Sequence, residues 1–120
     1  MSIGRVSSAA LMASGLAGVV APGKVAGGLH LAPAGPRGLA ETRAGLGGTY
    51  AALGCWALLS RSPVAQRAVG VTWLGAAVVR IAALKVDRPR ADWTYWAYLA
   101  GELGLGSGAV LASRTRPPSG

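Results

Sequence analysis

Long apolar segments recur along the chain and are separated by stretches rich in charge, proline or glycine. They cover residues 5–22, 41–60, 64–86 and 93–113. Each approaches the length of about 20 residues that a helix needs to cross the hydrocarbon core of a bilayer. None shows the alternation of apolar and polar residues that a barrel strand needs. The pattern predicts an all-α fold, an antiparallel up-down bundle of four transmembrane helices.

The connecting segments have the composition of turns and of the membrane interface. Residues 23–40 are rich in glycine and proline, which predicts an interfacial loop that is in part helical or re-entrant. Pro63 is placed to begin the third helix and Asp92 to cap the fourth. Residues 114–120 form a short polar tail. We therefore expect one integral membrane domain over residues 1–120.

The first segment has a second interpretation. A basic Arg5 before an apolar run is also typical of a signal peptide. The run closes at Ala21-Pro22-Gly23, which is a poor cleavage context, so we expect the segment to be retained.

Composition points to lipid as part of the solvent. Hydrophobic residues make up 52% of the chain and charged residues 13%, against about 25% charged residues in soluble domains. The net charge of +8 comes from basic residues that flank the apolar segments, where they suit anionic headgroups and give no nucleic-acid motif. We expect a multi-pass protein of the cell membrane whose partners are membrane lipids. The positive-inside rule is nearly balanced and favours cytoplasmic termini.

Charged side chains interrupt the apolar segments near one end of the predicted bundle. They are Glu41, Arg43, Arg80 and Glu102. Because successive spans run in opposite directions, all of them fall in the same half of the membrane, where exposure to lipid is costly. We expect a self-neutralising polar cluster inside the bundle, with Tyr98 one turn before Glu102 and in reach of its carboxylate. A buried pair that only fixes helix register is the structural alternative.

The remaining sequence features are small residues on the helices and a scarcity of histidine and cysteine. We expect helix-packing roles for glycines on the second and fourth helices, namely Gly47, Gly48, Gly104 and Gly108. These glycines lack the strand context and the lysine of a phosphate loop. His30 is the only histidine and Cys55 the only cysteine, so we expect no metal site, no cofactor and no enzyme activity.

The stretch from Glu41 to Gly54, ETRAGLGGTYAALG, precedes an arginine late in the third segment and a glutamate in the fourth. This pattern resembles the bacterial "domain of unknown function 4345" family of small proteins with four predicted membrane helices. The resemblance extends over roughly residues 5–113 and is sharpest over the stretch quoted. It implies the same architecture, with family positions at Glu41, Arg43, Gly47, Gly48, Arg80 and Glu102. It implies no activity.

Three functions fit these expectations. The first is a membrane protein that binds a small polar or amphiphilic ligand between Arg43, Arg80 and Glu102. The second is a proton-coupled or dimeric small transporter with Glu102 as the titratable carrier site, which leaves a homo-oligomer open. The third is an enzyme that acts on a lipid with Glu102 as acid or base, and the shortage of further polar groups makes it the least favoured.

Overall fold

A computed structural model describes residues 2–115, and every element in this range is helical. The helices are α1 (Ile3–Val20), α2 (Pro22–Gly28), α3 (Gly35–Thr42), the π-helical segment η1 (Arg43–Gly48), α4 (Thr49–Ser60), α5 (Pro63–Val86) and α6 (Trp93–Thr115). The predicted all-α class is confirmed. The first two residues of the predicted polar tail belong to α6, and residues 116–120 lie outside the described range.

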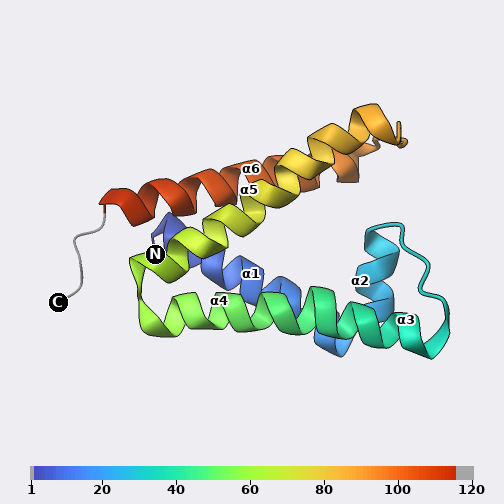
Figure 1. The fold of residues 1–120 in the computed structure, drawn as a ribbon, viewed down its shortest axis with the longest axis horizontal. Helices are drawn as coiled ribbons and strands as arrows, with labels where there is room; N and C mark the ends of the chain where they lie inside the picture. The colour runs from blue at the N-terminus through green and yellow to red at the C-terminus, as the bar shows by residue number, and fades with distance from the viewer. Residues whose placement is uncertain (1, 116–120) are drawn as a thin grey trace.

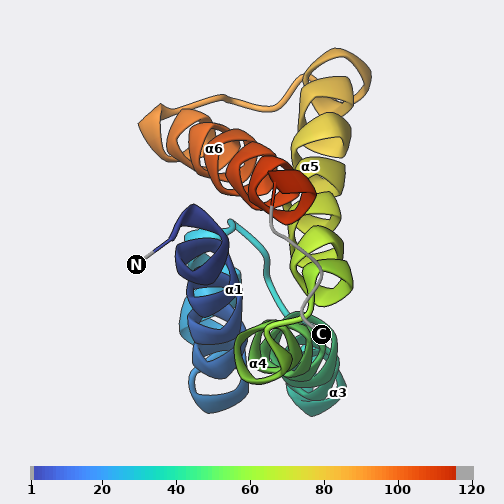
Figure 2. The same cartoon turned by 90° about the vertical axis from the view of Figure 1, so that its left-hand side faces the viewer.

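The long helical segments form two antiparallel hairpins (Figures 1 and 2). In one hairpin α1 packs along η1 and α4, and in the other α5 packs along α6. The backbone stays helical through both junctions of η1, so residues 35–60 make one continuous rod. The chain direction alternates from one long segment to the next, as the sequence predicted. The hairpins diverge towards the end at which α2 lies (Figure 1).

Local residues explain where the helices begin and end. The hydroxyl of Ser62 accepts a hydrogen bond from the backbone N–H of Ala65, and Pro63 begins α5 as predicted. The Asp92 carboxylate accepts from the backbone N–H of Tyr95 at 3.1 Å, so the predicted cap of α6 is also present. Arg61 adopts a left-handed conformation and ends α4.

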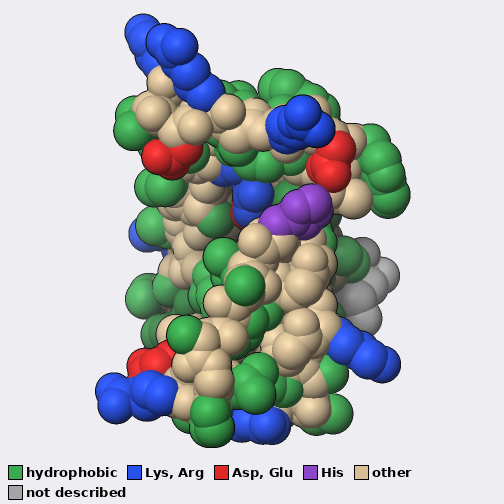
Figure 3. All heavy atoms as spheres, turned by 90° about the vertical axis from the view of Figure 1, so that its right-hand side faces the viewer, with side chains coloured by type: hydrophobic (Ala, Val, Ile, Leu, Met, Phe, Trp, Pro, Cys, Tyr) green, Lys and Arg blue, Asp and Glu red, His purple; other side chains and the backbone are tan. Residues whose placement is uncertain are grey.

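The predicted loop at 23–40 contains two short helices. Of these, α2 follows α1 after a break at Ala21 and folds back towards the space between the hairpins (Figure 1). Positive φ angles at His30 and Gly35 turn the chain between α2 and α3. The expectation of a partly helical connection is correct. Basic, acidic and histidine side chains gather on the end of the molecule where this connection lies (Figure 3).

Most of the large apolar side chains are exposed, and Leu11 and Val69 are large side chains that are fully buried. The buried hydrophobic residues are mostly alanines, and the buried polar ones are Ser7, Ser8, Gln66, Glu102 and Ser113. By contrast, Val20, Leu59 and Val86 are each more than three-quarters exposed, at 78%, 79% and 79%. The helices thus contact one another largely through small residues, around a small apolar core of Leu11, Ala57, Ala65 and Val69.

Close helix contacts depend on glycine, although not on all the glycines expected. A Cβ on Gly47 would lie 2.6 Å from the backbone nitrogen of Val19, and a Cβ on Gly108 would meet the Ile3 side chain at 2.3 Å. A Cβ on Gly104 would meet nothing within 4 Å, and one on Gly48 only the carbonyl of Arg43 at 4.0 Å. The packing role predicted for Gly48 and Gly104 is therefore wrong, because both positions turn away from neighbouring helices.

By length and composition, α1 and α5 are the two helices of the described residues that could cross a membrane. The fourth predicted segment, now α6, is long enough, but its mean hydropathy is too low because it contains a glutamate, several glycines and aromatic residues of low hydropathy. The second is divided by η1, which leaves α4 at 12 residues. The described residues thus form an all-helical fold in which two helices are long and apolar enough to cross a membrane.

Candidate functional site

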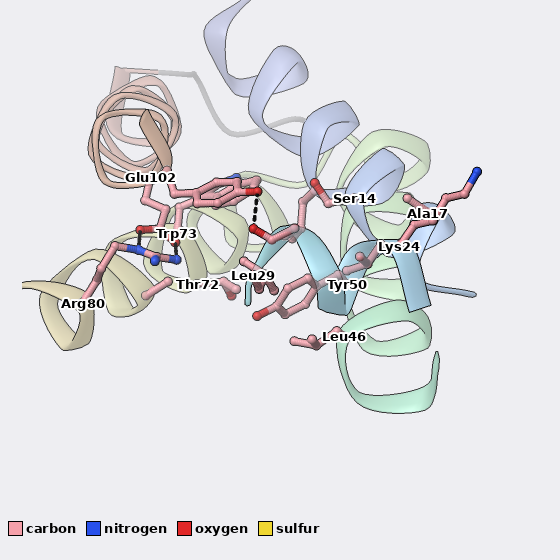
Figure 4. A pocket seen from close by; sticks show the side chains of 15 residues that line it. Ser14, Ala17, Lys24, Leu29, Leu46, Tyr50, Thr72, Trp73, Arg80 and Glu102 are labelled. Atoms are coloured by element: carbon pink, nitrogen blue, oxygen red, sulfur yellow. Dashed lines mark hydrogen bonds and ion pairs between the residues drawn. The ribbon is translucent and has the colours of Figure 1, made fainter. Parts of the chain in front are cut away.

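A cavity of about 430 Å³ lies between the two hairpins, with residues of α1, α2, η1, α4, α5 and α6 in its wall (Figure 4). Its volume is within the range of about 300–1,000 Å³ that is usual for small-molecule sites. Apolar and aromatic side chains form most of the wall, including Leu11, Leu46, Tyr50 and Trp73. Ser14, Lys24 and Thr72 add polar groups to the wall, and a carboxylate and a guanidinium form an ion pair at its edge.

These two groups are Arg80 of α5 and Glu102 of α6, which form a two-pronged ion pair (Figure 4). Arg80 Nε donates to Glu102 Oε1 at 2.8 Å, and Nη2 donates to Oε2 at 3.0 Å. The arginine side chain is 21% exposed and the glutamate side chain 9%. The fork geometry satisfies both carboxylate oxygens, which offsets much of the cost of removing two charges from water.

Two tyrosines of α6 hold the arginine in place. The Arg80 Cζ lies 5.1 Å from the ring centroid of Tyr95 and 5.4 Å from that of Tyr98, within the range of cation–π attraction. The Tyr95 hydroxyl also donates to the Arg80 backbone carbonyl at 2.6 Å. The guanidinium therefore has a fixed position, and its remaining nitrogen, Nη1, is the one that Glu102 does not use.

Tyr98 does not bond to Glu102, which corrects the sequence prediction. Its hydroxyl donates instead to the backbone carbonyl of Gly28 in α2, at 3.2 Å. Each carboxylate oxygen already accepts a hydrogen bond from Arg80, and the carbonyl at the end of α2 lacks an intrahelical donor. Tyr98 thereby ties α2 across the gap to α6.

Glu41 and Arg43 are absent from this cluster, contrary to the expectation that all the charges meet. Glu41 pairs with Arg37 one turn earlier at 2.8 Å, and both side chains are exposed. Arg43 Nη1 donates to the carbonyl of Val19 in the last turn of α1. A cation is favoured there because the helix end carries partial negative charge. Glu41 and Arg43 thus make their contacts within the first hairpin, at the end of α1 and in the rod of residues 35–60.

Several cavity residues were not singled out from the sequence. On α5, Thr72 and Ala76 precede Arg80 by eight and four residues and line the same cavity. That spacing places them on one helix face, so a helical projection from Arg80 would have found them. Trp73 is fixed by its indole N–H, which donates to the Ser7 carbonyl at 3.3 Å. The α2 residues could not be found, because nothing in residues 23–40 fixes how that segment folds back.

The rest of the described chain adds no obvious reactive centre. Within residues 2–115, no three side chains of histidine, cysteine, aspartate or glutamate come together as metal ligands would. The cavity itself offers a mostly apolar wall with aromatic faces, the side chains of Ser14, Lys24 and Thr72, and one ion pair.

Comparisons with known proteins give this chain no family, relative or structural neighbour: no family model, curated protein or solved structure matches it. The resemblance to the domain of unknown function 4345 family stays a prediction.

Proposed function

We propose that the chain is a multi-pass membrane protein in which α1, residues 35–60, α5 and α6 cross the bilayer, both ends on the cytoplasmic side. The pattern of burial supports this proposal: exposed valines and leucines suit lipid, and buried alanines, glycines and serines allow close packing without a hydrophobic driving force. Residues 35–60 reach about 39 Å as a helix, enough for a tilted span.

The function is to bind a small amphiphilic molecule in the cavity between the hairpins. The observation that carries this proposal is the Arg80–Glu102 pair at the edge of a mostly apolar cavity of about 430 Å³. The aromatic and aliphatic wall takes the apolar body of the ligand, and the N–H groups of Arg80 Nη1 bond to its oxygen. We propose binding rather than catalysis because the glutamate is committed to the arginine by two hydrogen bonds.

A cavity-filling substitution tests the proposal. The protein is placed in nanodiscs of neutral phosphatidylcholine, and binding of tritiated dodecanol is measured against empty nanodiscs. Ala76→Phe fills the cavity from α5 and is expected to abolish saturable binding. Ala82→Phe, the same change at an exposed position of the same helix, is the matched control and should bind like the parent. Equal saturable binding by both variants would refute the site.

Transport is the second candidate. It is favoured by one observation: Glu102 is a buried carboxylate beside a cavity, the setting of a carrier site in a membrane protein. Uptake of dodecanoate into proteoliposomes that requires a pH gradient and is lost in Glu102→Gln would support the carrier. Binding without such uptake would leave the binding function alone.

A further inference from the structure

A second hollow of about 260 Å³ adjoins the cavity and differs from it in chemistry. Both are lined by Gly28, Leu29, Arg80 and Tyr98, so these residues form a common wall. The other side chains around the second hollow include His30, Arg90, Asp92 and Thr94. It therefore lies at the charged end of the molecule that Figure 3 shows, where α2 meets the α5–α6 turn.

Few polar contacts hold this common wall together. A single hydrogen bond, from the Tyr98 hydroxyl to the Gly28 carbonyl, joins α6 to α2 across it. The Tyr98 side chain is not deeply buried, and a Cβ on Gly28 would lie 3.4 Å from its hydroxyl oxygen. A molecule that replaced this one contact could occupy both hollows at once. The apolar cavity and the charged hollow would then be two parts of one site.

Two guanidinium groups and one carboxylate line the second hollow, namely those of Arg80, Arg90 and Asp92. Arg80 is neutralised by Glu102. Asp92 Oδ1 accepts hydrogen bonds from the Thr94 hydroxyl at 2.6 Å and the Tyr95 N–H at 3.1 Å, and Oδ2 lies 3.8 Å from the His30 imidazole. Among the residues that the structure describes, Arg90 forms no ion pair. The hollow thus combines the exposed guanidinium of Arg90, which has no ion pair within the described residues, and the unused Nη1 of Arg80 with an Asp92 carboxylate whose Oδ1 already accepts two hydrogen bonds.

We propose that the ligand is a single-chain amphiphile with an anionic head. Its tail fills the apolar cavity, and its head lies in the second hollow against Arg90 and Nη1 of Arg80, in place of the Tyr98–Gly28 contact. This inference rests on the proposed binding function and names its ligand class. A carboxylate and a phosphate monoester share the chemistry that this site recognises, since both present oxygens to a guanidinium fork.

Competition against tritiated dodecanol in phosphatidylcholine nanodiscs tests the head site. The competitors are dodecanoate, dodecyl phosphate, dodecanol and dodecyltrimethylammonium, which share one chain and differ in head charge. At least one anionic competitor should bind about fivefold more tightly than dodecanol, the upper end of what an exposed ion pair contributes. The cation should bind less tightly than dodecanol. The better of the two anions identifies the head group.

Arg90→Gln should remove this anionic preference, so that dodecanoate and dodecyl phosphate bind to this variant no more tightly than dodecanol does. Arg88→Gln is the matched control, because Arg88 carries the same charge two residues away and does not line the hollow. For each probe, the affinity of Arg90→Gln is divided by that of Arg88→Gln. Partitioning of the probe into the lipid is the same in both measurements and therefore cancels from this ratio. Arg90→Lys keeps the charge and should keep most of the preference, which separates recognition of charge from a folding defect.

The outcomes distinguish this inference from the function on which it rests. Saturable dodecanol binding with no anionic preference, or with a preference equally reduced by Arg88→Gln and Arg90→Gln, would overturn the head site and leave the cavity intact. Absence of saturable binding by every probe would overturn both.

Discussion

Arg80 and Glu102 meet through two hydrogen bonds of 2.8 and 3.0 Å that join α5 to α6 across the edge of the cavity. They are 22 residues apart in the chain and come from successive antiparallel helices. Tyr95 and Tyr98 flank the guanidinium on the α6 side. The pair is thus both the strongest polar link between these helices and the polar feature of the candidate site.

We predict that the two charges are energetically coupled. Arg80→Leu or Glu102→Leu alone leaves the other charge buried without a partner, which typically costs about 3–5 kcal/mol. The double replacement should recover most of that loss, because neither charge then remains. Unfolding of the four proteins in detergent measures the coupling. Losses that simply add in the double variant would show that the pair contributes no mutual stabilisation.

An exposed pair provides the control for this cycle. Arg37 and Glu41 also meet at 2.8 Å, yet their side chains are 86% and 66% exposed. Arg37→Leu should change the free energy of unfolding by no more than about 0.5 kcal/mol, as for other surface pairs one helical turn apart.

The pairing of Arg80 with Glu102 could be predicted from the sequence because it follows from depth alone. Antiparallel spans place both residues in the same half of a bilayer, and an unpaired charge there is unfavourable. Depth does not give the rotation of a helix about its axis. Glu41 and Arg43 have a similar depth and still lie outside the cluster, since Arg43 is satisfied by the end of α1. The position of α2 depends on its packing against α1 and α3 and on a hydrogen bond to α6, which no local pattern specifies.

Removal of the Tyr98 hydroxyl should loosen α2. Tyr98→Phe keeps the ring beside Arg80 and loses the bond to the Gly28 carbonyl. Amide hydrogen exchange in residues 22–28 should become faster, while exchange in α5 stays the same. Tyr95→Phe, which loses a bond to Arg80 instead, is the control and should leave residues 22–28 unaffected. Faster exchange of α2 in both variants would indicate a general loss of stability.

The glycines give a prediction on packing. Gly47→Ala forces a methyl group against the backbone of Val19 and should destabilise the first hairpin by about 1–3 kcal/mol. Gly104→Ala adds a methyl group in open space and should be neutral or slightly stabilising, because alanine favours a helix. Thermal unfolding of the two variants in the same detergent makes the comparison. A larger loss for Gly104→Ala would mean that α6 has a neighbour on that face.

The cap of α6 predicts a pH dependence. The Thr94 hydroxyl, followed by the Tyr95 N–H, donates to the Asp92 carboxylate and lowers its pKa below the ordinary value. A carboxyl whose pKa is lower in the folded state stabilises that state above its unfolded pKa of about 3.9. This contribution is lost as the pH falls through the lower, folded value. Hydrogen exchange at the start of α6, corrected for its intrinsic pH dependence, should therefore become faster below about pH 4. Asp92→Asn should abolish this additional change, and an unaltered acid response in that variant would assign it to another group.

The position of the bound chain is the most direct test of a membrane-embedded amphiphile site. Nuclear Overhauser contacts are measured between protonated dodecanol and the protein in nanodiscs of deuterated phosphatidylcholine. Binding in the cavity predicts contacts from the dodecyl methylenes to the Trp73 indole and the Tyr50 ring, and their loss in Ala76→Phe with retention in Ala82→Phe. Contacts confined to outward side chains such as Val78 and Val79, unchanged in Ala76→Phe, would contradict it.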